Sequence, residues 1–281
     1  MGSGIAQVCA ASGYSTVIRE LSDELGKRSL ASIARSFDRA IEKGKSTAVD
    51  RDAALSRIRV TTTLRDLAEA DIVIEAVVED LGAKSEMFRE LDVLCAATTI
   101  FASNTSSLTI AEIAAATAHP DRFVGLHFFN PVPAMKLVEV VRAIRTSESA
   151  VERSMEFVRS LGKEPIRARD NSGFVVNLLL VPYMLDAIRA LESGVASVAD
   201  IDKGMMLGAG HPMGPFTLLD FVGLDTTFKI AEIMYVEYRE PRYAPPPLLK
   251  RMVIAGMYGK KSGLGFYDYS HSPPTPNELG V

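Results

Sequence analysis

Leu126-His127-Phe128-Phe129-Asn130-Pro131 closes one apolar stretch of this chain, and Leu137-Val138-Glu139-Val140-Val141 forms the next. Both stretches are rich in β-branched and aromatic residues and predict short buried strands, at residues 123–128 and 136–141. The prolines between them predict a turn. This strand–turn–strand segment is the point from which the rest of the chain can be interpreted.

The two predicted strands carry a possible acid–base pair. His127 ends the first strand, and Glu139 lies within the second, twelve residues further on. A histidine can take a proton from a substrate hydroxyl and return it near neutral pH. A carboxylate on its other ring nitrogen would fix the tautomer and stabilise the charged form. The alternative is that His127 is an ordinary core residue beside two phenylalanines.

Strand-like and helix-like segments alternate through the first 170 residues. Residues 71–77 are almost continuously apolar, as expected of a strand buried on both faces. Such alternation predicts an α/β fold with a doubly wound, Rossmann-type parallel sheet. The predicted strands lie at residues 15–19, 60–63, 71–77, 99–103, 123–128, 136–141 and 165–169.

The amino-terminal residues match the second half of a dinucleotide-binding unit. A helix-like run of small residues, 1–12, precedes a β-branched strand that ends at Glu20. An acid at this place hydrogen-bonds the adenosine ribose, which indicates NAD rather than NADP. The glycine fingerprint normally follows a strand and opens the helix. Here Gly2 can stand only for its last glycine, so we expect the first strand and two glycines to be missing from the chain.

The pattern becomes helical after residue 170. Residues 174–192 predict a long, largely apolar helix, and further helical segments follow it. We therefore predict two domains, an NAD-binding domain at 1–170 and a smaller all-helical domain at 171–281. The apolar helices indicate that the second domain forms a homodimer, and we also expect this domain to bind substrate.

Composition narrows the class of protein. The 281 residues are 47% hydrophobic and carry a formal net charge of -4, which argues against a nucleic-acid partner. Cys9 and Cys95 provide neither a disulfide framework nor a metal cluster, so we expect no metal and a cytoplasmic location. The longest apolar run, 174–185, contains Asn177 and Pro182 and is too short to span a membrane. No signal peptide is expected at residues 1–12.

Seven motifs together resemble the L-3-hydroxyacyl-CoA dehydrogenase family, including the bacterial 3-hydroxybutyryl-CoA dehydrogenases. They follow the family order and spacing across nearly the whole chain, and the middle ones are long enough to be specific. The motifs are Met1-Gly2-Ser3-Gly4-Ile5-Ala6-Gln7, Ser103-Asn104-Thr105-Ser106-Ser107-Leu108, His127-Phe128-Phe129-Asn130-Pro131-Val132-Pro133, Met135-Lys136-Leu137-Val138-Glu139-Val140-Val141, Gly173-Phe174-Val175-Val176-Asn177, Gly210-His211-Pro212-Met213-Gly214-Pro215 and Gly263-Leu264-Gly265-Phe266-Tyr267.

The resemblance implies NAD-dependent, reversible oxidation of an L-3-hydroxyacyl-CoA to the 3-ketoacyl-CoA. It assigns His127 as general base and Glu139 as the residue that orients it. Ser106 and Asn177 are implied to hydrogen-bond the reacting oxygen and the thioester end. Fixed donors of this kind stabilise charge that develops on oxygen. The chain departs from the family at Leu178, where arginine is common, and we expect only a modest effect.

The resemblance also implies two sets of ligand contacts. Ser36 and Lys43 align with residues that hold coenzyme A, although Lys43 could equally be a solvated helix end. Lys84 could instead be an ordinary exposed helix lysine. The implied cofactor contacts are Gly2, Glu20, Ala76, Glu79, Lys84, Asn104 and Asn130.

Two other functions fit part of the sequence. A non-catalytic nucleotide-binding or structural, crystallin-like member of the same fold would explain the incomplete glycine loop. A dehydrogenase of the 6-phosphogluconate or hydroxyisobutyrate type would use a lysine as its acid–base residue. The set Ser106, His127, Glu139 and Asn177 favours the 3-hydroxyacyl-CoA dehydrogenase.

Overall fold

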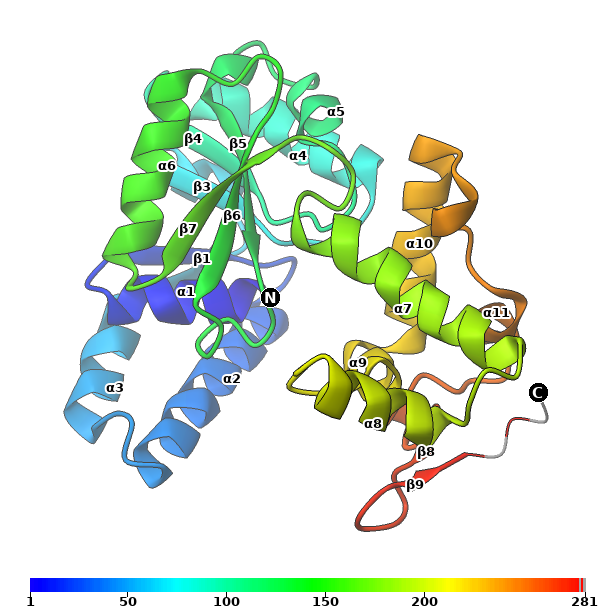
Figure 1. Ribbon diagram of the computed structural model, residues 1–281. Coiled ribbons are helices and arrows are strands. Elements are labelled where there is room, and N and C mark those ends of the chain that lie inside the picture. Colours follow the sequence, from blue (N-terminus) through cyan, green and yellow to red (C-terminus); the bar gives the residue numbers. More distant parts are fainter. Residues whose placement is uncertain (278, 280–281) are drawn as a thin grey trace. The chain divides into compact units, whose positions relative to one another are not determined.

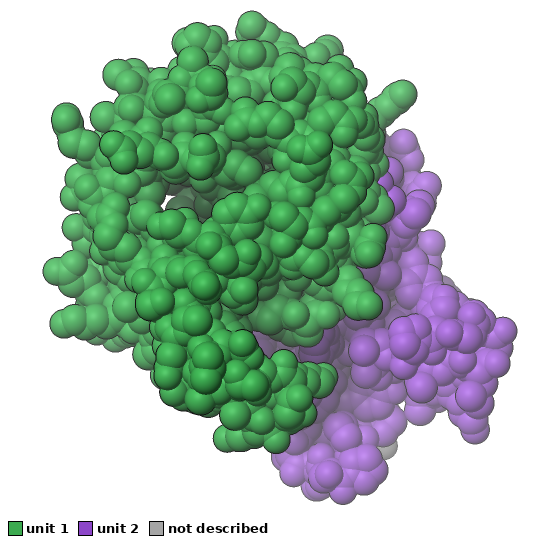
Figure 2. Space-filling view, turned by 90° about the vertical axis from the view of Figure 1, so that its left-hand side faces the viewer, with its two compact units in different colours: residues 1–171 green, residues 172–281 purple. Residues whose placement is uncertain are grey.

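The computed structural model describes residues 1–277 and 279 (Figure 1). The chain forms two compact units, 1–171 and 172–281 (Figure 2). The first unit contains, in order, α1 (Gly2–Ala11), β1 (Thr16–Arg19), α2 (Asp23–Glu42), α3 (Ala48–Ser56), β2 (Ile58–Thr61), η1 (Leu64–Leu67), β3 (Ile72–Glu75), α4 (Leu81–Leu94), β4 (Ile100–Ser103), α5 (Ile110–Ala114), η2 (Pro120–Arg122), β5 (Phe123–Phe128), β6 (Leu137–Arg142), α6 (Glu148–Ser160) and β7 (Glu164–Arg169).

The strands of the first unit form a five-stranded sheet, β3-β4-β5-β6-β7, and a separate pair, β1-β2. This confirms the α/β, Rossmann-type prediction, but the expected all-parallel sheet is wrong because β5 and β6 run antiparallel. Residues 129–136 are too few for a crossover helix, so the chain returns beside β5 as a hairpin. Among the described residues, β1 pairs only with β2 and β3 only with β4, so one continuous sheet is not formed.

Helices cover both faces of the five-stranded sheet (Figure 1). Ala102 of β4 points to one face, where it joins an apolar cluster with Ile5 of α1 and Val151 of α6. The next side chain along the strand points to the opposite face. There Phe101 packs on Phe88 of α4, with ring centroids 5.5 Å apart. Burial on both faces explains why most residues of the central strands are apolar.

The β1-β2 pair has a smaller apolar core of its own. Ile18 of β1 packs with Ile33 and Phe37 of α2, all less than 9% exposed. Helix α2 begins where the Ser22 hydroxyl accepts a hydrogen bond from the Leu25 N–H, which satisfies one of the unpaired donors at the helix start. The amphipathic α2 therefore turns one face to the strands and its basic side chains to solvent.

Strand direction brings several predicted site residues to one edge of the sheet. Strands β3, β4 and β5 are parallel, so their carboxyl ends lie together. Ala76 follows β3, Asn104 follows β4, and His127 lies one residue before the end of β5. This edge is where ligands of open α/β sheets bind.

The second unit is helical apart from two short strands, so the prediction of an all-helical domain is confirmed in its main feature. Gly173 and Phe174 have φ of 83° and 48°, so α7 begins at Val176 rather than at residue 174. In the described part of the chain no helix is long and apolar enough to cross a membrane. The elements are α7 (Val176–Glu192), α8 (Val198–Gly208), α9 (Pro215–Val222), α10 (Leu224–Tyr238), η3 (Pro241–Tyr243), α11 (Pro247–Ile254), η4 (Lys260–Ser262) and the two-residue strands β8 (Tyr267–Asp268) and β9 (Thr275–Pro276).

Candidate active site

The hairpin of β5 and β6 brings His127 and Glu139 together. The two residues are direct partners in the strand register, and His127 Nδ1 lies 2.6 Å from Glu139 Oε2. The Glu139 side chain is fully buried and that of His127 is 8% exposed. Low polarity around such a contact strengthens it. Because Nδ1 faces the carboxylate, Nε2 is the atom that would exchange a proton with a substrate.

Asn104 is tied to the strand that carries His127. Its side-chain oxygen accepts a hydrogen bond of 2.9 Å from the Phe128 N–H. This contact fixes which side of the amide is oxygen and leaves the nitrogen as a donor at the same edge of the sheet. Asn130, two residues beyond Phe128, is exposed on the turn that follows β5.

A single carboxylate organises the loop that contains Ser106. Glu79 Oε1 accepts hydrogen bonds from the Thr105 hydroxyl at 2.5 Å, the Ser106 N–H at 3.1 Å, and the N–H and hydroxyl of Ser107 at 3.2 and 2.9 Å. Burial acts to raise the pKa of Glu79, but the Thr105 hydrogen bond, the charge of Lys84 and the Ser107 and Ser106 contacts together lower it. Glu79 is therefore ionised at neutral pH, and its charge holds residues 105–107 in place.

Lys84 lies behind this carboxylate. Its side chain is 1% exposed, and its ammonium is 3.2 Å from Glu79 Oε2 and 2.7 Å from Oε1 of the fully buried Glu75. The alternative of an ordinary exposed helix lysine is thus wrong, because α4 directs this side chain into the protein. A direct contact between Lys84 and the cofactor stays a prediction.

The remaining predicted cofactor residues lie near the amino end of α1 and the end of β1. A Cβ atom added to Gly2 would lie 3.8 Å from the Cβ of Ala76, an ordinary contact, whereas one on Gly4 would lie 3.1 Å from Val132. The tighter approach is therefore at Gly4. Glu20 is half-buried, and its Oε1 accepts a hydrogen bond of 2.8 Å from Ser29, which leaves Oε2 for a ribose hydroxyl.

The other three predicted residues belong to α2, to its carboxyl end or to the second unit. Ser36 and Lys43 are seven residues apart on one face of α2, with Lys43 exposed at the carboxyl end of the helix. Asn177 belongs to the second unit, in the first turn of α7. Their ligand contacts stay predictions.

Sequence inspection missed several residues that hold the site together. Glu75 accepts hydrogen bonds from Lys84 and Ser103, and Asp170 accepts the N–H groups of Ile110 and Ala111 at the start of α5. For Glu75 a signal existed, because a charge inside a strand buried on both faces requires a partner. For Asp170 no local sequence pattern predicts the partners, because Ile110 lies sixty residues earlier in the chain.

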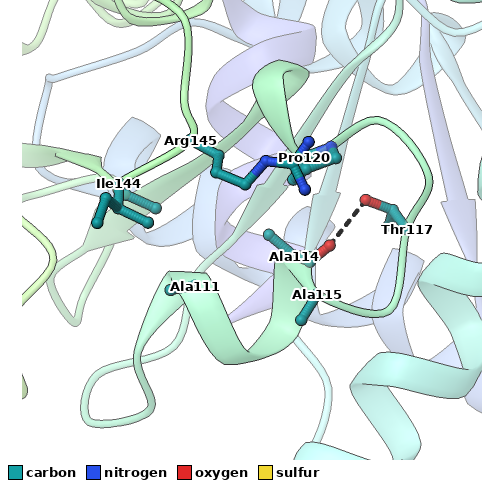
Figure 3. A pocket seen from close by; sticks show the side chains of 8 residues that line it. Ala111, Ala114, Ala115, Thr117, Pro120, Ile144 and Arg145 are labelled. Carbon is teal, nitrogen blue, oxygen red and sulfur yellow. Dashed lines mark hydrogen bonds between the residues drawn. The ribbon is translucent and has the colours of Figure 1, made fainter.

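A small apolar hollow lies elsewhere on the first unit (Figure 3). Helix α5 contributes Ala111 and Ala114, and the segment after β6 contributes Ala143, Ile144 and Arg145. Because β6 is antiparallel to β5, this place lies at the start of β5, opposite the end that carries His127. The hollow is not part of the candidate active site. The described residues form no cluster of His, Cys, Asp or Glu suited to a metal ion.

Two family models together match nearly the whole chain. The model for the NAD binding domain of 3-hydroxyacyl-CoA dehydrogenase matches residues 1–171, and the model for the C-terminal domain of the same enzyme matches residues 173–269. The first match starts at residue 1, so the expectation that a first strand and two glycines are missing is not borne out.

Similar proteins agree with these matches. A 3-hydroxybutyryl-CoA dehydrogenase of Mycobacterium tuberculosis is 52% identical, covering 96% of this chain and 95% of its own. The human mitochondrial hydroxyacyl-coenzyme A dehydrogenase is 46% identical, covering 96% and 88%. The crystal structure of M. tuberculosis FadB2 superposes with a TM-score of 0.94 at 52% identity over 96% and 95% of the chains. That of the (S)-3-hydroxybutyryl-CoA dehydrogenase PaaH1 from Ralstonia eutropha gives 0.92 at 44% identity over 96% of both.

Proposed function

This chain belongs to the 3-hydroxyacyl-CoA dehydrogenase family, and we propose that it oxidises a short L-3-hydroxyacyl-CoA, such as L-3-hydroxybutyryl-CoA, reversibly to the 3-ketoacyl-CoA with NAD. The observation that carries this proposal is the buried contact of 2.6 Å between His127 and Glu139 at the ligand-binding edge of the sheet. A histidine oriented in this way fits the removal of a hydroxyl proton.

The residues of the first unit fit an NAD molecule. The second carboxylate oxygen of Glu20 suits a ribose hydroxyl, and the amide nitrogen of Asn104 provides a donor beside β5. Ala76, Glu79 and Asn130 follow strands that end at the same edge. When bound, NAD supplies the hydride acceptor.

In the oxidation, His127 Nε2 accepts the proton of the 3-hydroxyl group. Glu139 holds Nδ1 and stabilises the imidazolium that forms, because a buried opposite charge favours the protonated ring. Ser106 and Asn177 donate hydrogen bonds to the substrate oxygens, and this lowers the energy of charge developing there. In the reverse direction His127 returns the proton.

The substrate's nucleotide end requires a cationic surface. Lys43 is exposed at the carboxyl end of α2 and Ser36 lies on the same face, which supports a role in binding the coenzyme A phosphates. Lys43 offers the point charge that phosphate attracts. These two contacts affect binding rather than the chemical step.

The direct test is NADH formation by the purified chain with L-3-hydroxybutyryl-CoA. We expect turnover with the L epimer and NAD, little with the D epimer, and much less with NADP. An absence of turnover with NAD while NADH still binds would favour the non-catalytic alternative. Faster turnover with NADP would overturn the role of Glu20.

We also propose a homodimer formed through the second unit. Several apolar side chains of this unit are exposed, among them Leu207 at 76%, Leu179 at 66% and Val236 at 59%. These exposed apolar side chains support a protein partner, because such residues mark an interaction site where they form one patch. Light scattering after gel filtration tests this, and a monomer at micromolar concentration would contradict it.

A cytoplasmic location is also part of the proposed function, and it is supported by the unpaired thiols of Cys9 and Cys95.

A further inference from the structure

A chain of three charged side chains, Glu75, Lys84 and Glu79, lies behind the candidate active site, and Glu75 makes none of the proposed catalytic or cofactor contacts. Glu75 is the last residue of β3, and its side chain is fully buried. Its Oε1 accepts hydrogen bonds of 2.7 Å from Lys84 Nζ and from the Val77 N–H, and its Oε2 accepts one of 2.5 Å from the Ser103 hydroxyl. Each of its oxygens thus has a partner.

The chain of contacts leads from Glu75 to the loop of Ser106. Lys84 lies between Glu75 and Glu79, and Glu79 in turn accepts the N–H groups of Ser106 and Ser107. Two of the three charged side chains are almost completely removed from solvent. The contacts therefore connect Glu75 of the sheet, through the buried Lys84 ammonium and Glu79, to the loop that carries Ser106.

Stability alone gives a weak reason for this arrangement. Removing two charges from water costs several kcal/mol each in general, and apolar side chains of similar volume are often at least as stabilising. What the ions add is fixed geometry, since a hydrogen-bonded carboxylate and ammonium allow only a narrow range of positions. The geometry they fix here is that of Glu79 and hence of residues 105–107.

We propose that Glu75 is a positioning residue of the active site: it holds Lys84, Lys84 holds Glu79, and Glu79 holds Ser106 in place. This inference rests on the proposed function only for the role of Ser106 in turnover. Loss of the Glu75 charge leaves Lys84 with Glu79 as its one anionic partner, so the ammonium shifts toward Glu79 and competes with its loop contacts. The loop then becomes more mobile.

The test is a double-mutant cycle of Glu75→Gln and Lys84→Met. Glutamine preserves the size of the side chain and can still accept from Lys84 and donate to Ser103. We expect each single variant to lower kcat by about 10- to 100-fold, the scale of a misplaced active-site group. The double variant should be no slower than the slower single variant, because the two residues act in series. Multiplying effects in the double variant would overturn the proposal.

Hydrogen exchange gives a readout that needs no substrate. In Glu75→Gln the amides of Ser106 and Ser107 should exchange about tenfold faster, while those of β7 stay unchanged. Unchanged exchange at residues 105–107 would overturn the proposal even if activity fell. If exchange at these amides is faster but the wild-type chain shows no turnover, the positioning role of Glu75 stands and only the proposed function is rejected.

A matched control separates positioning from stability. Asp92 and Arg122 form another buried ion pair in the same unit, 2.7 Å apart with both side chains 7% exposed. Asp92→Asn should lower the Tm yet leave kcat and exchange at residues 105–107 unaltered. If it changed them as much as Glu75→Gln does, the effect would reflect general loosening, and the proposal would fail. If Lys84→Met does not fold, Ser103→Ala replaces it, with a smaller loss of kcat expected.

Discussion

His127 and Glu139 are direct cross-strand partners, with Nδ1 and Oε2 2.6 Å apart. The contact depends on the antiparallel return of β6, because a parallel crossover would have placed the glutamate elsewhere. Both strands are buried and hydrogen-bonded to neighbours, so neither ring nor carboxylate has much freedom to reorient. The pair is therefore rigid before any ligand arrives.

Replacing His127 by glutamine should lower turnover by about 10²- to 10⁴-fold, the scale of lost general-base catalysis. Glutamine retains a polar side chain of similar reach, so folding should be preserved. Steady-state kinetics and a thermal melt together check this. The matched control is His119→Gln, an exposed histidine of the same unit, which should change neither quantity. Full activity of His127→Gln with a lowered Tm would mark the histidine as structural.

Replacing Glu139 by glutamine should depress kcat near neutral pH with little change in the KM for the acyl-CoA. The amide keeps a hydrogen-bonding group beside Nδ1 but removes the charge that stabilises the imidazolium. Glu139 has no exposure to solvent and so cannot contact the substrate directly. A kinetic comparison with wild type at several substrate concentrations separates the two parameters. An unchanged kcat would rule out the orienting role.

The sequence predicted the candidate site where an apolar strand pattern and a chemically reactive side chain occur in the same segment. Two apolar runs separated by prolines predicted β5 and β6, and the polar residues within them predicted the His127–Glu139 pair. The direction of β6 could not be read from the same residues, because a buried strand has the same pattern in either orientation. Only the short connection between the strands forces the hairpin.

Long-range polar partners were beyond sequence reasoning. In the sequence Glu75 is one residue of an apolar strand, and Lys84 is either an implied cofactor contact or an ordinary exposed helix lysine. Their meeting depends on how α4 packs on the sheet through Phe88, a property of tertiary structure. The same holds for Lys163, whose two partners lie about thirty residues earlier in the chain.

Replacing Lys163 by methionine should destabilise the turn after β5. Lys163 is 7% exposed and donates to the carbonyl oxygens of Val132 and Met135, both at 2.7 Å. Methionine fills the space but leaves these carbonyls without their donor, at a cost of about 1–3 kcal/mol. Chemical denaturation measures the loss. Lys136→Met, at an exposed lysine of the same segment, should have almost no effect, and equal losses would contradict the assignment.

The stability of the second unit should depend on pH through Asp220. This carboxyl is 1% exposed and accepts the N–H groups of Phe266 and Tyr267, both at 2.9 Å. Burial raises its pKa from 3.8 to about 6, against those hydrogen bonds. Between these pH values the folded state keeps a proton that the unfolded state has lost. The contribution of the protonated Asp220 carboxyl to the stability of the folded state is therefore complete below about pH 4, and it is lost as the pH rises through about 6.

The difference in unfolding free energy between wild type and Asp220→Asn isolates this effect. Asparagine costs stability because its amide presents an N–H to one of the two backbone donors. This cost is constant with pH because the amide does not titrate. Wild type should therefore lose stability relative to the variant as pH rises from 4 to 7, by at most about 3 kcal/mol for a shift of two pKa units. Asp186→Asn, at an exposed carboxylate whose side chain is 68% accessible, serves as control. A difference that stayed flat with pH would show that Asp220 is ionised throughout, with its two backbone donors outweighing burial.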